Sequence, residues 1–189
     1  MYTTLLEKIS TQRAVIGLIG LGYVGLPLAA RAGRLGFRVL GFDVSAAKVR
    51  TINAGESDVG DVPGDTIAAL RQQDRLEATT EMTRLGECDL IIICVPTPLN
   101  KTRDPDMSYI EQAANDIAAA LRPGQLIVLE STTWPGTTEE IVLPRLTLAG
   151  LSVGEDFFLA FSPERIDPGQ VSTLVFRCNG CGAYNETLD

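Results

Sequence analysis

No histidine occurs among the 189 residues, and there are only four cysteines. A structural zinc site needs four ligands, which come mainly from these two residue types. Cys178 and Cys181 form a single CxxC and cannot supply four ligands, so the sequence predicts no metal site. Cys88 and Cys94 lie in or beside an apolar run, where free cysteine usually acts as a small hydrophobic residue.

Basic charge and long apolar segments are scarce as well. The formal net charge is −8 and the pI is about 4.6, so no basic surface is available to neutralise nucleic-acid phosphates. The longest wholly apolar run, 90–95, is far shorter than the roughly 20 residues of a membrane helix. Residues 1–14 also lack the apolar region of a signal peptide. We therefore expect a cytoplasmic protein that binds neither nucleic acid nor membrane.

What the sequence does contain is a regular alternation of short apolar runs and helical patterns. Hydrophobic residues make up 45% of the chain, as in an ordinary globular protein. Strands that are apolar throughout, with helices between them, are typical of a parallel sheet covered on both faces. The sequence thus predicts an α/β fold with a doubly wound parallel sheet. The expected strands are 14–20, 37–43, 89–95, 125–131 and 156–162, with a weaker candidate at 75–80.

The helices are indicated by their capping residues. Ser45 precedes a helical segment that Gly55 ends, and we expect Gly124 to stop a longer helix. Two further helix starts have the spacing of a capping box, in which a Ser or Thr and a Glu three residues later satisfy free backbone N–H groups. These pairs are Ser108 with Glu111 and Thr137 with Glu140.

The segment GLGYVG follows the first expected strand and opens a helix, which is the setting of a dinucleotide-binding loop. Gly20 allows the tight turn, Gly22 lets the backbone approach a pyrophosphate, and Gly25 lets the helix and strand pack closely. Tyr23 and Val24 complete the loop. Phosphates would lie at the positive end of the helix, so the fold expected is a Rossmann-type domain.

An acid at the end of the second strand is the other half of this fingerprint, and Asp43 stands there. Its carboxylate can accept hydrogen bonds from both ribose hydroxyls and would repel a 2′-phosphate. The sequence therefore favours NAD over NADP, although Lys48 leaves NADP open. FAD remains a competitor at this point.

Three further motifs lie where strands should end. Together with GLGYVGLPLA and GFDVSAAKV, they closely resemble the UDP-glucose/GDP-mannose dehydrogenase superfamily over residues 14–169. We accordingly expect a Rossmann-type NAD-binding domain at 1–169. The motifs are VPTP at 95–98, STTWPGTT at 131–138 and FSPERIDPG at 161–169.

The resemblance implies two successive NAD-dependent oxidations, which convert a sugar C6 alcohol to a carboxylate through a thioester on a catalytic cysteine. It implies that Thr97 and Thr133 line the nicotinamide end of the cofactor, with Thr133 part of the catalytic site. Glu164 would activate or position water for thioester hydrolysis, and Lys48 would lie beside the adenosine ribose. The substrate would be a UDP-sugar, and full-length members would form homo-oligomers.

The chain also departs from the family pattern. The family places its nucleophilic cysteine in a GGxCxPxDP-type motif and its catalytic Lys and Asn on a helix, and neither motif occurs here. Cys178 and Cys181 are not followed by Pro-x-Asp, and residues 170–189 read as an atypical tail in place of the family's central helix and C-terminal substrate domain. We expect the chain by itself to bind NAD without completing the oxidation.

The residues after Glu164 bear on the substrate. Arg165 and Pro168 resemble the branch that oxidises UDP-N-acetylhexosamines, and UDP-N-acetylglucosamine 6-dehydrogenases of polysaccharide biosynthesis fit best. Arg165 is therefore the expected substrate-binding residue. The alternatives are a fragment of a UDP-glucose 6-dehydrogenase, a dehydrogenase of the β-hydroxyacid or 6-phosphogluconate group, and a non-catalytic NAD-binding module.

Overall fold

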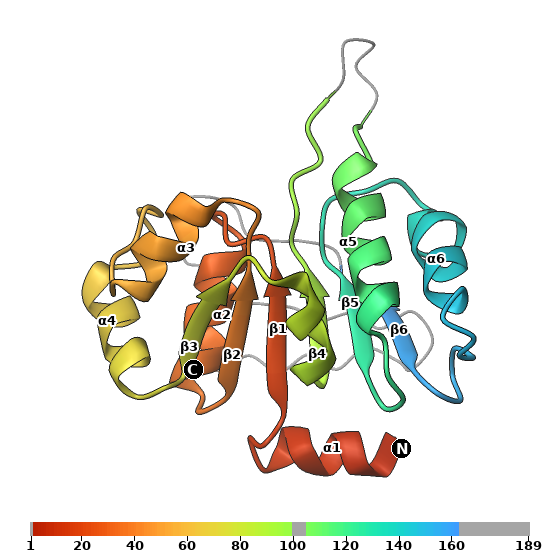
Figure 1. The fold of residues 1–189 in the computed structure, drawn as a ribbon, viewed down its shortest axis with the longest axis horizontal. Helices are drawn as coiled ribbons and strands as arrows, with labels where there is room; N and C mark the ends of the chain where they lie inside the picture. The colour runs from red at the N-terminus through yellow and green to blue at the C-terminus, as the bar shows by residue number, and fades with distance from the viewer. Residues whose placement is uncertain (1, 100–104, 163–189) are drawn as a thin grey trace.

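The computed structural model describes residues 2–99 and 105–162, which form a six-stranded sheet with helices on both faces (Figure 1). The strand order is β3-β2-β1-β4-β5-β6, and every neighbouring pair is parallel. Each expected strand is confirmed, and the weaker candidate is the edge strand β3. The strands are β1 Val15–Ile19, β2 Arg38–Phe42, β3 Leu76–Thr79, β4 Leu90–Ile93, β5 Leu126–Leu129 and β6 Phe158–Phe161.

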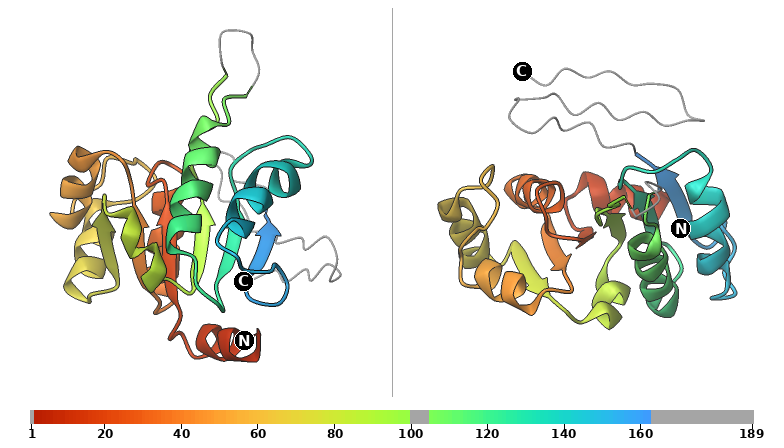
Figure 2. Two further views of the ribbon diagram at one scale, coloured as in Figure 1. Left: turned by 45° about the vertical axis from the view of Figure 1, so that its right-hand side comes forward. Right: turned by 90° about the horizontal axis from the view of Figure 1, so that it is seen from above.

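The helices other than α1 divide between the two faces of the sheet (Figure 2). One core cluster joins the sheet to α2, α3 and α4, and the other joins it to η1, α5, η2 and α6. Helices on both faces of a parallel sheet make the fold doubly wound, as expected. The helices are α1 Tyr2–Ser10, α2 Gly25–Arg34, α3 Ala46–Asn53, α4 Gly64–Gln72, η1 Met82–Glu87 (3₁₀), α5 Ser108–Ala120, η2 Thr138–Val142 (π-helical) and α6 Leu143–Thr147.

The predicted boundaries of α3 are confirmed. Ser45 Oγ accepts a hydrogen bond from the Lys48 N–H, and Gly55 follows the helix with a φ of 84°. Glycine adopts this left-handed conformation without the steric cost that a Cβ would add.

The other helix-end predictions need correction. Ser108 is the first residue of α5, but its N–H is bound by Asp106 Oδ1 at 3.0 Å, since a carboxylate just upstream satisfies the donor first. α5 ends at Ala120, because Leu121 is already extended, and not at Gly124, which has a φ of 86° in the turn before β5.

The capping box at Thr137 is also wrong. The Thr137 hydroxyl donates to Trp134 O at 2.8 Å, and the Glu140 N–H donates to Gly136 O at 2.8 Å. The helix here begins with the π-helical turn η2, which is wider than an α-helical turn. The three-residue spacing of Thr137 and Glu140 therefore does not place their side chains against the free N–H groups of the helix start.

Helix α1, which the sequence analysis did not predict, lies across the amino ends of the strands (Figure 1). Leu5 is buried, and Lys8 Nζ is 2.8 Å from the buried carboxylate of Asp89. Asp89 also binds Arg122 at 2.9 Å and the Val15 N–H at 3.1 Å. This network ties α1, β1 and the start of β4 together at the edge opposite to the expected cofactor site.

Within the part of the chain that the structure describes, none of the helices has the length and apolar character needed to span a membrane. The predicted domain boundary at 169 and the atypical tail at 170–189 lie outside the described residues.

Candidate functional site

The candidate site lies at the carboxyl ends of β1 and β4, which are neighbours in the sheet. The chain leaves β1 toward β2 on one side and leaves β4 toward β5 on the other. In an open parallel sheet, the crevice outside such a reversal of strand order is the usual ligand site.

The glycine loop packs against the end of β4 at very short range. Gly20 has a φ of 92°, and a Cβ there would lie 2.6 Å from Cys94 O. A Cβ on Gly25 would lie 1.8 Å from Gly20 O, so a side chain cannot be added without moving the backbone. These two glycines let α2 begin directly above the end of β1.

Gly22 differs from these two, because no atom lies within 4 Å of where its Cβ would be. The space over Gly22 is therefore free for a ligand, and it lies beside the N-terminus of α2. Val24 is the N-cap of that helix and offers no side-chain hydrogen bond, while Tyr23 is 65% exposed beside it. Backbone N–H groups at a helix start bind phosphate well, so the loop suits a dinucleotide pyrophosphate.

Asp43 follows β2 at the other end of this loop. Its Oδ2 accepts a hydrogen bond from the Leu21 N–H at 3.0 Å, and its Oδ1 accepts one from the Ser45 N–H at 2.9 Å. A carboxylate has about four lone-pair positions, so both oxygens can accept further hydrogen bonds from ribose hydroxyls. The acid thus holds the loop and also suits the ribose.

Lys48 contacts the glycine loop and has a partner that no sequence motif indicated. Lys48 Nζ is 3.3 Å from Leu21 O and 3.1 Å from Asp58 Oδ2. Asp58 comes from the loop between α3 and α4, and no motif distinguishes it from other loop acids.

The loops after β4 and β5 are joined to each other. Ser131 Oγ donates to Val95 O at 2.8 Å, and Thr97 Oγ1 donates to Thr132 O at 2.9 Å. Thr133, half-buried, follows Thr132 directly. The structure therefore brings the loops with Thr97 and Thr133 together. The predicted catalytic Glu164 and substrate-binding Arg165 lie outside the described residues.

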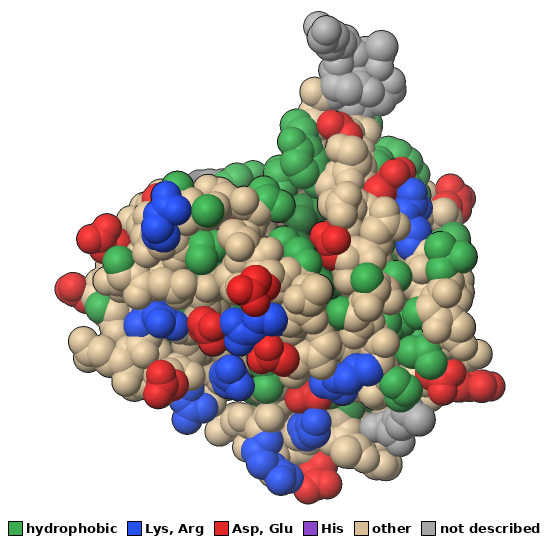
Figure 3. All heavy atoms as spheres, in the orientation of Figure 1, with side chains coloured by type: hydrophobic (Ala, Val, Ile, Leu, Met, Phe, Trp, Pro, Cys, Tyr) green, Lys and Arg blue, Asp and Glu red, His purple; other side chains and the backbone are tan. Residues whose placement is uncertain are grey.

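Large hydrophobic side chains are exposed along the same edge, in segments that follow the strands. In Figure 3 hydrophobic side chains gather at the upper middle of the molecule, near the ends of β1 and β4. An exposed apolar region of this kind indicates a surface that a ligand or another part of a protein covers. The exposed residues after strand ends include Tyr23, Val44, Leu99 and Trp134.

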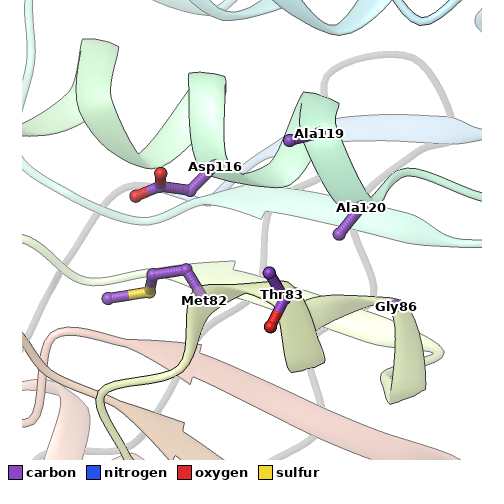
Figure 4. A pocket seen from close by; sticks show the side chains of 6 residues that line it. All are labelled: Met82, Thr83, Gly86, Asp116, Ala119 and Ala120. Carbon is purple, nitrogen blue, oxygen red and sulfur yellow. The ribbon is translucent and has the colours of Figure 1, made fainter.

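A separate pocket opens between η1 and α5, as Figure 4 shows. It shares no residue with the loops described above. Its lining is mostly small side chains, namely Met82, Thr83, Gly86, Asp116, Ala119 and Ala120.

Two cysteines lie in the described part of the chain, and neither is presented at this edge as a reactive thiol. Burial raises the pKa of the Cys88 thiol to about 12. Cys94 is 9% exposed and lies under the glycine loop. Since the thiolate is the nucleophilic form, this burial disfavours Cys88 as a nucleophile.

Comparison with known families places these loops in context. Residues 14–179 match the model of the UDP-glucose/GDP-mannose dehydrogenase family, NAD binding domain. The chain belongs to this family. Its cofactor is NAD, and the Rossmann-type fold expected from the glycine loop is confirmed.

Individual relatives support the assignment. UDP-N-acetyl-D-glucosamine 6-dehydrogenase of Salmonella typhi is 40% identical over 156 residues, which make up 82% of this chain and 36% of the relative. UDP-N-acetyl-D-mannosamine dehydrogenase of Pyrococcus horikoshii is 35% identical over 173 residues, 90% of this chain and 41% of the relative. The chain thus spans between 36% and 41% of the length of these two proteins.

Among solved structures, a ternary complex of GDP-mannose dehydrogenase from Pseudomonas aeruginosa aligns with a TM-score of 0.77 at 35% identity. The alignment covers 80% of this chain and 36% of that one. The likeness supports the sheet and the loop arrangement described above.

Proposed function

We propose that this chain supplies the NAD-binding half of an enzyme that oxidises the C6 alcohol of a UDP-N-acetylhexosamine to the carboxylate. The observation that carries the proposal is the 40% and 35% identity to two dehydrogenases named for UDP-N-acetylhexosamines. The PERIDPG segment, with Arg165 after Glu164, supports the same substrate class. A guanidinium offers several hydrogen-bond donors, which suit the carbonyl oxygen of an acetamido group.

In this proposal the described residues bind and orient the cofactor. NAD, when bound, accepts a hydride from the alcohol carbon. The N–H groups of the glycine loop hold the pyrophosphate, Asp43 accepts hydrogen bonds from the adenosine ribose, and Lys48 lies beside it. Thr97 and Thr133, on loops joined to each other, orient the nicotinamide end. Their hydroxyl groups can both donate and accept hydrogen bonds there.

Two further roles come from residues outside the described part. Glu164 would hold or activate the water that hydrolyses the thioester, and Arg165 would contact the sugar. The nucleophilic cysteine would come from a part of the enzyme that this chain does not contain, because no GGxCxPxDP-type motif occurs here and the two cysteines in the described residues, Cys88 and Cys94, are buried. We therefore propose that the 189 residues have no turnover of their own.

The experiment that tests the substrate class restores the missing part by fusing the corresponding segment of a relative. The values of kcat/KM for UDP-N-acetylglucosamine, UDP-N-acetylmannosamine and UDP-glucose are then compared. We expect a preference for one of the acetylated sugars, which would also identify the epimer. Arg165→Gln in the same fusion should narrow the preference for the acetylated sugar over UDP-glucose. The intact relative, which keeps its own NAD-binding half, serves as the reference. A preference for UDP-glucose would reject the proposed branch.

A further inference from the structure

The ammonium group of Lys48 lies at the ribose end of the NAD site and is paired with an acid there. It is 3.3 Å from Leu21 O and 3.1 Å from Asp58 Oδ2. The N–H of the same Leu21 binds Asp43. Lys48 thus binds the backbone carbonyl of Leu21, and Asp43, the acid assigned to the ribose, binds the backbone N–H of the same residue.

A cation at this position bears on which dinucleotide the site accepts. In this fold the acid after the second strand binds the ribose 2′-hydroxyl of NAD, whereas sites for NADP place a cation nearby to bind the 2′-phosphate. Lys48 would be such a cation if its charge were not balanced. With Asp58 bound to it, the group of Asp43, Lys48 and Asp58 carries a net negative charge, which repels a phosphate.

The position of Asp58 is fixed by its neighbours in the loop. Val59 is 8% exposed and its N–H donates to Ser57 Oγ at 3.1 Å. Val62 is also buried, and its N–H donates to Val59 O at 3.0 Å. The loop is therefore held against the core on one side of Asp58, and its carboxylate reaches a Lys48 side chain that is only 22% exposed.

We propose that Asp58 is a specificity-determining residue, which keeps the site selective for NAD over NADP by neutralising Lys48. The inference rests on the assignment of this edge as the NAD site, and it requires neither the proposed sugar substrate nor catalysis. An ion pair of this exposure contributes little to stability, so the charge can be removed without unfolding the chain.

The test is Asp58→Asn, with the dissociation constants of NAD⁺ and NADP⁺ measured by calorimetric titration at low salt. We expect the ratio of the NADP⁺ constant to the NAD⁺ constant to fall by about fivefold or more, as for one unit charge a few ångströms away. The change should shrink at high salt, because the charges are partly exposed. Adding Lys48→Met to Asp58→Asn should abolish the gain for NADP⁺.

Asp61→Asn is the matched control, since Asp61 is exposed in the same loop and the substitution removes the same charge while leaving the Lys48 pair intact. An equal change in Asp61→Asn would overturn the proposal, because it would show a general effect of net charge. An unchanged ratio in Asp58→Asn would overturn it as well. Weaker NAD⁺ binding with no gain for NADP⁺ would instead show that Asp58 binds the ribose itself, and would also reject the role proposed here.

Discussion

The N–H of Leu21 donates a hydrogen bond to Asp43 Oδ2 at 3.0 Å, so the acid assigned to the ribose also fixes the glycine loop. The other oxygen of Asp43 binds the Ser45 N–H at the start of α3. One carboxylate therefore joins the segments after β1 and β2. This arrangement reduces the ordering that NAD binding would otherwise have to impose on the loop.

Asp43→Ala should weaken NAD⁺ binding about 10- to 100-fold, because hydrogen bonds to a charged group contribute roughly 1.5–3 kcal/mol. Asp43→Asn keeps one acceptor oxygen and should lose less. Calorimetric titration of both variants checks this, with Asp61→Ala as the control for loss of an acid. If Asp43→Ala binds as the parent does, Asp43 has no part in the site.

Two glycine variants should separate binding from folding. Gly22→Ala places its methyl group in open space and should melt close to the parent, yet bind NAD⁺ much more weakly because the pyrophosphate needs that space. Gly25→Ala forces its methyl group against Gly20 O and should lower Tm by several degrees, since overpacking costs about 1–3 kcal/mol. Thermal melts and titrations of the pair decide this. Full NAD⁺ affinity in Gly22→Ala would contradict the assigned path of the pyrophosphate.

Asp89 should make stability depend on pH. Burial acts to raise the pKa of Asp89, but hydrogen bonds from Lys8, Arg122 and the Val15 N–H outweigh it and hold the pKa below its ordinary value. A carboxyl group with a lowered pKa stabilises the folded state above its unfolded pKa, and this contribution is lost as the pH falls through the folded pKa.

Asp89→Asn should accordingly lower the free energy of unfolding by about 1–3 kcal/mol near neutral pH. The difference in the free energy of unfolding between parent and variant should become smaller well below about pH 4, the unfolded pKa of Asp. Urea unfolding at a series of pH values measures both quantities. If this difference in free energy stays constant as the pH is lowered, the charge of Asp89 has no role in stability.

The isolated chain should show no dehydrogenase turnover, because a covalent route needs an accessible nucleophile. The formation of NADH with each UDP-sugar should equal that of the blank. If a steady rate survives purification, Cys178→Ser and Cys181→Ser would reveal whether a thiol outside the described residues is responsible. Loss of that rate in either variant would contradict the proposed inactivity.

The strands and the glycine loop could be predicted because they depend on short segments of sequence. A buried parallel strand must be apolar throughout, and Gly20 and Gly25 have no substitute where a Cβ would strike the backbone. The Ser45 cap was predicted correctly because its acceptor and donor are three residues apart in one helix.

The parts that could not be predicted depend on competition or on distant contacts. Ser108 has the right residue type for a cap, but Asp106 supplies the acceptor first. Asp58 lies near the ribose end only because the loop after α3 folds back on Lys48. Helix α1 buries only Leu5, and its position depends on a distant contact, the ion pair of Lys8 with Asp89.

The placement of α1 has a practical consequence. It lies before the first residue of the family match and covers the amino edge of the sheet, whereas the loops assigned to the cofactor emerge from the carboxyl edge. A label, tether or fused domain attached at α1 would therefore not obstruct the binding of the dinucleotide. Substitutions that stabilise the Asp89 network could likewise be combined with substitutions of Asp58 that change the preference between NAD and NADP. The two sets of substitutions would act at opposite ends of the strands.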